Sequence, residues 1–344
     1  MKILVTGSSG FIGHHLVKHL QKKGHWVRGV DWKKSEYSYE ADEFLLLDLR
    51  YRENAEKSVE GMNFVYALAA DMGGMGFIQA KENQALILYN NTMINFNTIN
   101  AIKEEGIKNG FYSSSACIYP NYKQNEAKII SLKESDAYPA DPQDTYGWEK
   151  LQAEHLVKSY NDCYEMNIKI GRFHNIYGPE GSYNDGREKA PAAMCRKVIN
   201  AKNKKQDFIE IWGDGTYIRS FCYIDDCLKA LDLIIKSDSN RPVNIGRDDG
   251  ITINELAKLA MKIGKVDLEI KHIDGPLGVK GRNSDNTLFK KKFGWVPEIS
   301  MEEGLTKTYC WIEKEINRKQ NKNLNSKQKQ NLKEFNVDYQ LISI

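Results

Sequence analysis

Close to the start of the chain stands the segment Lys2-Ile3-Leu4-Val5-Thr6-Gly7-Ser8-Ser9-Gly10-Phe11-Ile12-Gly13. Its apolar first half predicts a buried strand over residues 2–6, and an amphipathic pattern typical of a helix follows over residues 11–23. The glycines between them permit a tight turn and a close approach of the backbone to phosphate oxygens at the start of a helix. This order of elements predicts a dinucleotide-binding loop, and its expected members are Gly7, Gly10, Phe11, Ile12 and Gly13.

Alternating strand and helix patterns continue through the first half of the chain, as in the βαβ units of a parallel sheet. Further strands are predicted at 26–31, 44–47, 63–68, 110–115 and 167–171, and further helices near 52–59, 83–105 and 145–165. Beyond about residue 178, short elements alternate with turn-rich segments, and Thr252 with Glu255 forms a capping box that marks a helix start. The sequence therefore predicts an α/β fold. A Rossmann-type doubly wound parallel sheet occupies mainly residues 1–178, and a smaller substrate-binding domain occupies mainly residues 179–316, with some chain exchange.

Two acidic residues at strand ends are candidates for contacts with the adenosine half of the dinucleotide. Asp31 lies 18 positions beyond Gly13, at the end of the second predicted strand, where a carboxylate accepts the ribose hydroxyls. It also repels a 2′-phosphate, which favours NAD over NADP, although Lys33 and Lys34 weaken that preference. Asp48 ends the third strand and is expected to meet the adenine edge, with a simple strand-end cap as the alternative.

A second set of residues predicts redox chemistry. Tyr146 and Lys150 share one face of a predicted helix because they are four residues apart. The lysine charge is expected to stabilise tyrosinate and so make Tyr146 a base near neutral pH. Ser115 ends the preceding strand and can bind the same substrate hydroxyl. With NAD, these three residues predict hydride transfer from a carbinol carbon.

The composition narrows the classes of partner. The chain has 344 residues and a formal charge of +3, and residues 317–344 alone carry six basic and two acidic residues. The rest of the chain is therefore close to neutral and offers no electrostatic footprint for nucleic acid. The basic segment 317–344 is expected to be a flexible tail. No run of 18 or more apolar residues is present, so no membrane span is expected.

Six scattered cysteines form neither a CxxC pair nor a Cys/His cluster. We expect free thiols, no disulfide framework and no metal site. The first strand begins directly after Met1-Lys2, which leaves no room for a targeting segment, so the expected place of work is the cytoplasm.

With these motifs in place, the chain resembles the extended short-chain dehydrogenase/reductase superfamily. The resemblance rests on Arg172-Phe-His-Asn175-Ile-Tyr177-Gly178-Pro179 and on Arg219-Ser-Phe-Cys-Tyr-Ile-Asp225. A narrower resemblance is to the GDP-mannose 3,5-epimerase family, and it covers residues from Gly7 to about Trp311. Its carriers are Asp71-Met-Gly73-Gly74-Met75-Gly76-Phe77, Ser114-Ser115-Ala116-Cys117-Ile118-Tyr119-Pro120, Gly186-Arg187-Glu188-Lys189-Ala190-Pro191 and Arg282-Asn-Ser-Asp285-Asn286.

The resemblance implies epimerisation of a nucleotide sugar through transient oxidation at C4, with Cys117 and Lys189 as the acid/base pair. The oxidation acidifies the C–H bonds at C3 and C5, and the returned hydride leaves no net redox change. Arg219 and Arg282 are implied to hold the diphosphate, for which guanidinium groups are chemically suited. The implied substrate contacts are Gly73, Gly74, Ser115, Asn175, Glu188, Lys189, Ala190, Tyr217, Arg219 and Arg282.

Some alternatives stay open. Tyr217 stands where the family has a glutamine, so the identities of the sugar and of the nucleotide base stay open. Another nucleotide-sugar 4-epimerase, a dehydratase or a reductase is the nearest alternative, and a dinucleotide-binding sensor without catalysis is a more distant one. A dehydratase is disfavoured because it carries an acid where Ala116 and Cys117 stand. By analogy with the superfamily, the helices at 83–105 and 145–165 are expected to form a homodimer.

Overall fold

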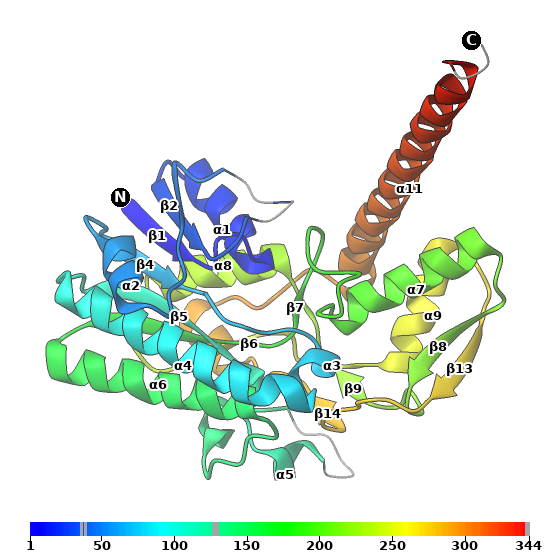
Figure 1. Cartoon of the computed structure of the whole chain (residues 1–344). Coiled ribbons are helices and arrows are strands. Elements are labelled where there is room, and N and C mark those ends of the chain that lie inside the picture. Colours follow the sequence, from blue (N-terminus) through cyan, green and yellow to red (C-terminus); the bar gives the residue numbers. More distant parts are fainter. Residues whose placement is uncertain (35–36, 38–39, 126–130, 341–344) are drawn as a thin grey trace.

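A seven-stranded sheet forms the centre of the molecule (Figure 1). The computed structural model describes residues 1–34, 37, 40–125 and 131–340. Every pairing in this sheet is parallel. The strand order is β11-β6-β5-β4-β1-β2-β3, with bounds β1 Lys2–Thr6, β2 Trp26–Asp31, β3 Glu43–Leu46, β4 Phe64–Ala67, β5 Asn109–Ser115, β6 Asn167–Phe173 and β11 Val243–Ile245.

Helices cover both faces of the sheet because its strands are apolar on both sides. Along β1, Ile3 and Val5 belong to one buried cluster, while Leu4 belongs to the other. The first cluster includes residues of α1 (Phe11–Lys22) and α8 (Ile224–Ile234). The second is covered by α2 (Arg52–Val59), α4 (Lys81–Glu104) and α6 (Thr145–Tyr164). This arrangement confirms the predicted doubly wound α/β fold.

The C-terminal half returns to the sheet once. After two short strands, β7 (Ile176–Tyr177) and β10 (Cys222–Tyr223), the chain forms α8 on the sheet and then β11 at its edge. The six predicted strands and four predicted helices all lie within about two residues of their expected bounds. Strand β11 was not predicted, because three residues give no periodicity.

Short helices and strands from the C-terminal half of the chain form a layer over the carboxyl ends of the sheet strands, and we call this layer the cover. They are α7 (Ala190–Lys204), α9 (Ile253–Gly264), a parallel pair of β8 (Phe208–Trp212) and β13 (Glu269–Ile273), and a small sheet of β9 (Ile218–Arg219), β12 (Ile251–Thr252) and β14 (Gly281–Arg282). The predicted capping box opens α9: Thr252 Oγ1 accepts from the backbone N–H of Glu255, and Glu255 accepts from that of Thr252.

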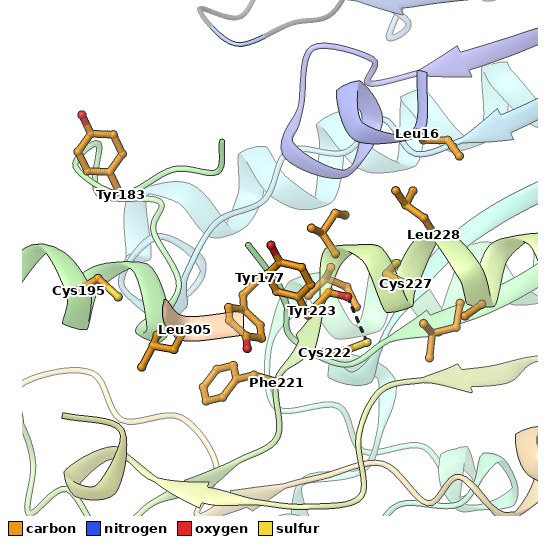
Figure 2. Close-up of a cluster of buried hydrophobic side chains, with 14 of the residues drawn as sticks. Leu16, Tyr177, Tyr183, Cys195, Phe221, Cys222, Tyr223, Cys227, Leu228 and Leu305 are labelled. Atoms are coloured by element: carbon orange, nitrogen blue, oxygen red, sulfur yellow. Dashed lines mark hydrogen bonds between the residues drawn. The ribbon is translucent and has the colours of Figure 1, made fainter. Parts of the chain in front are cut away.

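One continuous apolar core joins the two parts. Figure 2 shows Leu16 of α1 facing Leu228 of α8, with Tyr177, Phe221 and Tyr223 packed beneath them. All six cysteines are free thiols, as predicted, and the four buried ones are Cys117, Cys195, Cys222 and Cys227. Short strands of the second part thus rest on the same core that supports the sheet, which fixes the cover relative to the carboxyl edge.

The last helix, α11 (Met301–Gln340), packs on α7 and α9 with its first turns and then projects away from the body (Figure 1). Leu305, Tyr309 and Ile312 are buried in the core. The chain stays helical through the segment 317–340. Its lysine and glutamine content favours a helix, and no glycine or proline interrupts it after Gly304. The flexibility of this tail stays a prediction. No described helix is both long and apolar enough to cross a membrane.

Candidate active site

A first cavity of about 400 Å³ opens at the carboxyl ends of β1, β2 and β4. The connections after β1 and β4 run to opposite sides here, which is the switch point where α/β sheets bind ligands. All nine residues predicted to bind the cofactor line this cavity: Gly7, Gly10, Phe11, Ile12, Gly13, Asp31, Asp48, Tyr146 and Lys150.

The glycine loop has the shape of a backbone cradle. Gly7 has a φ of 67°, which residues with a side chain rarely adopt. A Cβ on Gly13 would lie 2.0 Å from the carbonyl oxygen of Gly7, so only glycine allows the helix to start this close to the strand. The N–H of Gly10 donates to the same carbonyl at 3.0 Å. The loop therefore fits a dinucleotide, whose diphosphate would lie against the start of α1.

Asp31 and Asp48 differ in their hydrogen-bond partners within the protein. Asp31 is buried at the end of β2, and its Oδ2 accepts from the N–H of Ser9 at 3.0 Å. Burial raises the pKa of Asp31, so a hydrogen-bond donor from the cofactor would be favourable there. Asp48 accepts two bonds of 3.0 Å from Nε of Arg50, and this guanidinium lowers the pKa of Asp48. A role of Asp48 at the adenine stays a prediction.

Replacing Asp31 with alanine should weaken NAD binding about 10- to 100-fold, the usual effect of losing charge-assisted hydrogen bonds. NADP binding should change much less, because its 2′-phosphate gains nothing from this carboxylate. Titration of cofactor-stripped protein with both dinucleotides measures the ratio, and the thermal melting curve serves as the control for folding. Equal affinity of the unaltered protein for NAD and NADP would remove this role from Asp31.

A second cavity of about 420 Å³ lies under the cover and adjoins the first. Cys117 and all ten residues predicted to contact the substrate line it: Gly73, Gly74, Ser115, Asn175, Glu188, Lys189, Ala190, Tyr217, Arg219 and Arg282. Six residues line both cavities, namely Met72, Gly73, Ser115, Tyr146, Phe173 and Lys189. Of the candidate redox and acid/base groups, Ser115, Tyr146 and Lys189 lie where the two cavities meet, whereas Lys150 lines only the first cavity and Cys117 only the second.

Tyr146 and Lys150 are positioned by the start of α6, where the Asp144 side chain accepts from the N–H of Gly147 at 2.8 Å. Nζ of Lys150 donates to Tyr112 Oη and to a backbone carbonyl, each at 3.1 Å. It lies 5.7 Å from the ring centre of Tyr146.

Burial of this pair opposes the charge effect that the sequence suggested. Desolvation raises the pKa of Tyr146 well above its usual value and lowers the pKa of Lys150. The Lys150 ammonium donates to other groups, so the role of Tyr146 as a base near neutral pH stays a prediction.

Cys117 and Lys189 come from different elements and meet in the second cavity. Cys117 follows β5 in a short 3-10 turn, where its N–H donates to Ser115 Oγ at 3.1 Å. Nη1 of Arg282 donates to Cys117 Sγ at 3.1 Å. Lys189 precedes α7, and burial lowers its pKa, assisted by the charge of Arg282 and opposed by Cys117. A lysine of lowered pKa can exchange a proton near neutral pH.

Arg219 supplies a second guanidinium to this cavity. Its donors reach the backbone carbonyl oxygens of Ile218, Leu277 and Val279 at 2.8, 3.2 and 2.6 Å. Burial, with the charge of Arg282, lowers the pKa of Arg219. In the described part of the chain, neither arginine forms a salt bridge with a carboxylate. Two uncompensated positive charges in one cavity favour an anionic ligand.

Gly73 and Gly74 are also needed for close packing, and their contacts with the substrate stay a prediction. A Cβ on Gly74 would lie 2.4 Å from the carbonyl oxygen of Glu188, and one on Gly73 would lie 2.9 Å from the side chain of Phe77. Gly74 is thus needed for close packing of segment 71–77 on segment 186–190, and Gly73 for close packing within segment 71–77. An ion pair at 2.8 Å between Arg187 and Asp71 closes the same wall.

Two further residues predicted to contact the substrate, Glu188 and Asn175, already form hydrogen bonds within the protein. The Glu188 carboxylate accepts from Arg196 at 2.7 Å. Asn175 has a φ of 47°, and its side-chain amide donates to the carbonyl oxygen of Ser220 at 3.0 Å. Gln143 also lines the second cavity with a buried Oε1 that lacks a partner, and sequence reasoning missed it because an isolated glutamine gives no signal.

The fold, the glycine loop and the two joined cavities define a nucleotide-binding oxidoreductase-type site. The chain matches the NAD dependent epimerase/dehydratase family over residues 3–246, and it belongs to this family. Within the family it is similar to GDP-mannose 3,5-epimerase of Arabidopsis thaliana, with 51% identity over 94% of this chain and 85% of that protein. GDP-mannose 3,5-epimerase 1 of Oryza sativa subsp. japonica is 49% identical over 92% of this chain and 82% of that protein.

Solved structures show the same fold. UDP-glucose 4-epimerase of Thermotoga maritima, crystallised with UDP-glucose, matches with a TM-score of 0.83 and 27% identity, covering 92% of this chain and all of that one. UDP-glucuronic acid 4-epimerase of Bacillus cereus, in complex with UDP-glucuronic acid and NAD, matches with a TM-score of 0.77 and 25% identity, covering 91% and 99%.

Proposed function

We propose that this protein is an NAD-dependent epimerase that inverts C3, C5 or both centres of GDP-mannose, giving GDP-L-gulose and GDP-L-galactose. The observation that carries the proposal is that a thiol and an amine, Cys117 and Lys189, line the same second cavity, and that Lys189 also lines the first. Sugar 4-epimerisation needs no acid/base pair at C3 or C5, whereas inversion beside a C4 ketone needs two. The similarity to the plant GDP-mannose 3,5-epimerases supports the same reaction.

The glycine loop and Asp31 would hold NAD in the first cavity, where it would supply reversible hydride transfer at C4 of the hexose. Tyr146 takes the C4 hydroxyl proton, and Ser115 binds the same oxygen. Lys150 lies behind the phenol, where its Nζ donates to Tyr112 Oη and to the carbonyl oxygen of Ser113. A positively charged cofactor in the first cavity would supply a second cation that favours ionisation of the phenol.

The acid/base step uses Cys117 and Lys189, which both line the second cavity. The C4 ketone makes the neighbouring C–H bonds acidic through the enolate, so a thiolate or a neutral amine can remove the proton. Nη1 of Arg282 donates to Cys117 Sγ, and burial lowers the pKa of Lys189, which favours the neutral amine. Inversion requires that one of the pair removes the proton and the other returns it to the opposite face.

Arg219 and Arg282 would bind the diphosphate, since they bring two uncompensated guanidinium groups to the second cavity. Arg282 also contacts Cys117, so the same residue would connect phosphate binding with the acid/base step. Tyr217 lines the same cavity, at a position where a glutamine was expected. Its phenol would therefore make a different contact with the sugar or with the nucleotide base than that glutamine.

Product analysis tests the proposed reaction. The protein with NAD and GDP-mannose should give GDP-hexose epimers, identified by chromatography and NMR after hydrolysis, with no net change in nicotinamide absorbance. UDP-glucose and UDP-glucuronic acid serve as matched substrates for the 4-epimerase alternative. Inversion of either UDP-sugar at C4, without conversion of GDP-mannose, would replace the proposal with that alternative.

We also propose a homodimer in the cytoplasm. Along α4, the side chains of Leu86, Tyr89, Met93 and Phe96 follow one stripe at helical spacing, and the first two are 57% and 60% exposed. Packing α4 and α6 against the same helices of a second copy would bury this stripe. Six free thiols are compatible with a reducing compartment.

Placing aspartate at Leu86 and Tyr89 should convert the dimer into a monomer, because two charges would enter an apolar interface. Light scattering after size-exclusion chromatography measures the mass. The double variant of Lys81 and Gln84 to aspartate, at exposed positions of the same helix outside the stripe, is the control. A dimer that survives in the Leu86/Tyr89 variant places the interface elsewhere.

A further inference from the structure

Gln124 is a buried polar residue that lines neither cavity. It is the last residue of the short helix α5 (Asn121–Gln124), which lies near β14 (Figure 1). Only 1% of Gln124 is exposed. A buried side-chain amide is costly unless its polar atoms are hydrogen-bonded, so the partners of this amide indicate its role.

The partners of the Gln124 amide allow one orientation only. Its Nε2 donates to the carbonyl oxygens of Tyr119 and Pro120 at 2.8 and 3.2 Å, and carbonyl oxygens can only accept. Its Oε1 accepts from Nε of Arg282 at 2.5 Å, and a guanidinium can only donate. The amide therefore joins the segment that follows Cys117 to the side chain of Arg282.

The Arg282 guanidinium reaches this segment from the cover. The backbone of Arg282 belongs to β14, where its carbonyl oxygen accepts from the N–H of Ser220 at 3.1 Å. Its Nη1 donates to Cys117 Sγ at 3.1 Å. Because a guanidinium is planar and rigid, the bond at Nε fixes the directions of both Nη groups. Nη2 forms no hydrogen bond with another described residue, which leaves it for a phosphate oxygen.

A neutral amide holds the guanidinium without cancelling its charge. A carboxylate in the same place would also accept from Nε, but it would form a salt bridge and weaken the attraction for a second anion. Within the described residues, Arg282 has no such carboxylate partner. Gln124 therefore fixes the direction of Arg282 and leaves its positive charge available in the second cavity.

We propose that Gln124 is a positioning residue that holds the Arg282 guanidinium against Cys117 and preserves its charge for the diphosphate. Without the amide, Arg282 would be free to turn entirely toward the diphosphate, and Cys117 would lose this partner. The consequence for the rate rests on the proposed function, which takes Arg282 as a diphosphate ligand and Cys117 as one of the acid/base pair. The orientation of Arg282 itself does not depend on the reaction.

Two variants of the full chain separate the orientation of Arg282 from the packing of the turn. Gln124→Met removes the whole amide, whereas Gln124→Glu keeps an acceptor for Nε of Arg282. Both variants lose the bonds donated to Tyr119 and Pro120. A residue that only braced this segment would therefore give the same loss in both.

The kinetic constants should change in opposite ways. Gln124→Met should lower kcat for epimerisation and deuterium exchange about 10- to 100-fold, the usual effect of a misplaced group, with KM for GDP-mannose changed less than about threefold. Gln124→Glu should recover most of kcat. It should raise KM about tenfold, because its carboxylate cancels part of the charge that binds the diphosphate.

Crystal structures of the two variants test the orientation without relying on activity. The contact between Nη1 of Arg282 and Cys117 Sγ should be lost in Gln124→Met and kept in Gln124→Glu. The proposal is overturned if Gln124→Met keeps this contact or the kcat of the parent, or if Gln124→Glu loses the contact or loses kcat as strongly as Gln124→Met. Each variant can overturn it alone, so the test stands if one of them does not fold. A parent that fails to epimerise GDP-mannose would contradict the proposed function, and the structures would still decide whether Gln124 orients Arg282.

Discussion

Replacing Tyr146 with phenylalanine should abolish both epimerisation and the exchange of substrate hydrogens with solvent. Without the phenol no group removes the C4 hydroxyl proton, so the ketone does not form and the C–H bonds at C3 and C5 stay non-acidic. Loss of a general base typically costs 10²- to 10⁴-fold in rate. The loss here should lie at the upper end, because every later step depends on the oxidation. NMR in deuterated water measures both activities in one sample.

Tyr66→Phe is the matched control for this variant. Tyr66 is another buried phenol of the sheet, and it lines neither cavity. Its hydroxyl has no hydrogen-bond partner, so its removal should leave the rate almost unchanged. Both variants should bind NAD. Deuterium exchange at a normal rate in Tyr146→Phe would show that the C–H bonds become acidic without oxidation at C4.

Replacing Cys117 with alanine should lower epimerisation and solvent exchange by roughly 100-fold or more, while NAD and GDP-mannose still bind. The oxidation at C4 does not need the thiol, so the 4-keto sugar and reduced nicotinamide should accumulate. The absorbance of the reduced cofactor after substrate is added follows this directly. Lys189→Ala should harm inversion more than exchange if the amine mainly returns the proton, because Cys117 alone can only return it to the face it came from.

Cys195→Ala controls for the loss of a buried thiol. Cys195 is fully buried in the apolar core outside both cavities, so this change should lower stability without altering the rate at a temperature where the protein is folded. Full epimerisation by Cys117→Ala would reduce the thiol to a packing residue and leave the base to be sought among the other groups of the second cavity.

Local patterns were sufficient for the sheet and for the cofactor loop. The strand at 2–6, the glycine spacing and Asp31 lie within one βαβ unit, so their geometry follows from the order of residues along the chain. Tyr146 and Lys150 could be paired for the same reason, because four residues of helix bring them to one face. These predictions needed no knowledge of contacts between distant segments.

The contacts that shape the second cavity could not be predicted in this way. Arg282 reaches the sulfur of Cys117 across 165 residues, and the sequence suggested only a phosphate contact for this arginine. Gly74 is explained by the carbonyl oxygen of Glu188, again a long-range contact. The burial that raises the pKa of Tyr146 likewise cannot be predicted from the spacing of residues.

Incubation with NAD and GDP-mannose in deuterated water, followed by NMR of the sugar, tests the central claim most directly. The account predicts deuterium at C3, C5 or both, inversion at the labelled centres, retained hydrogen at C4 and no net reduction of NAD. Inversion at C4 without label at C3 or C5, or reduced nicotinamide formed in proportion to the product, would contradict it.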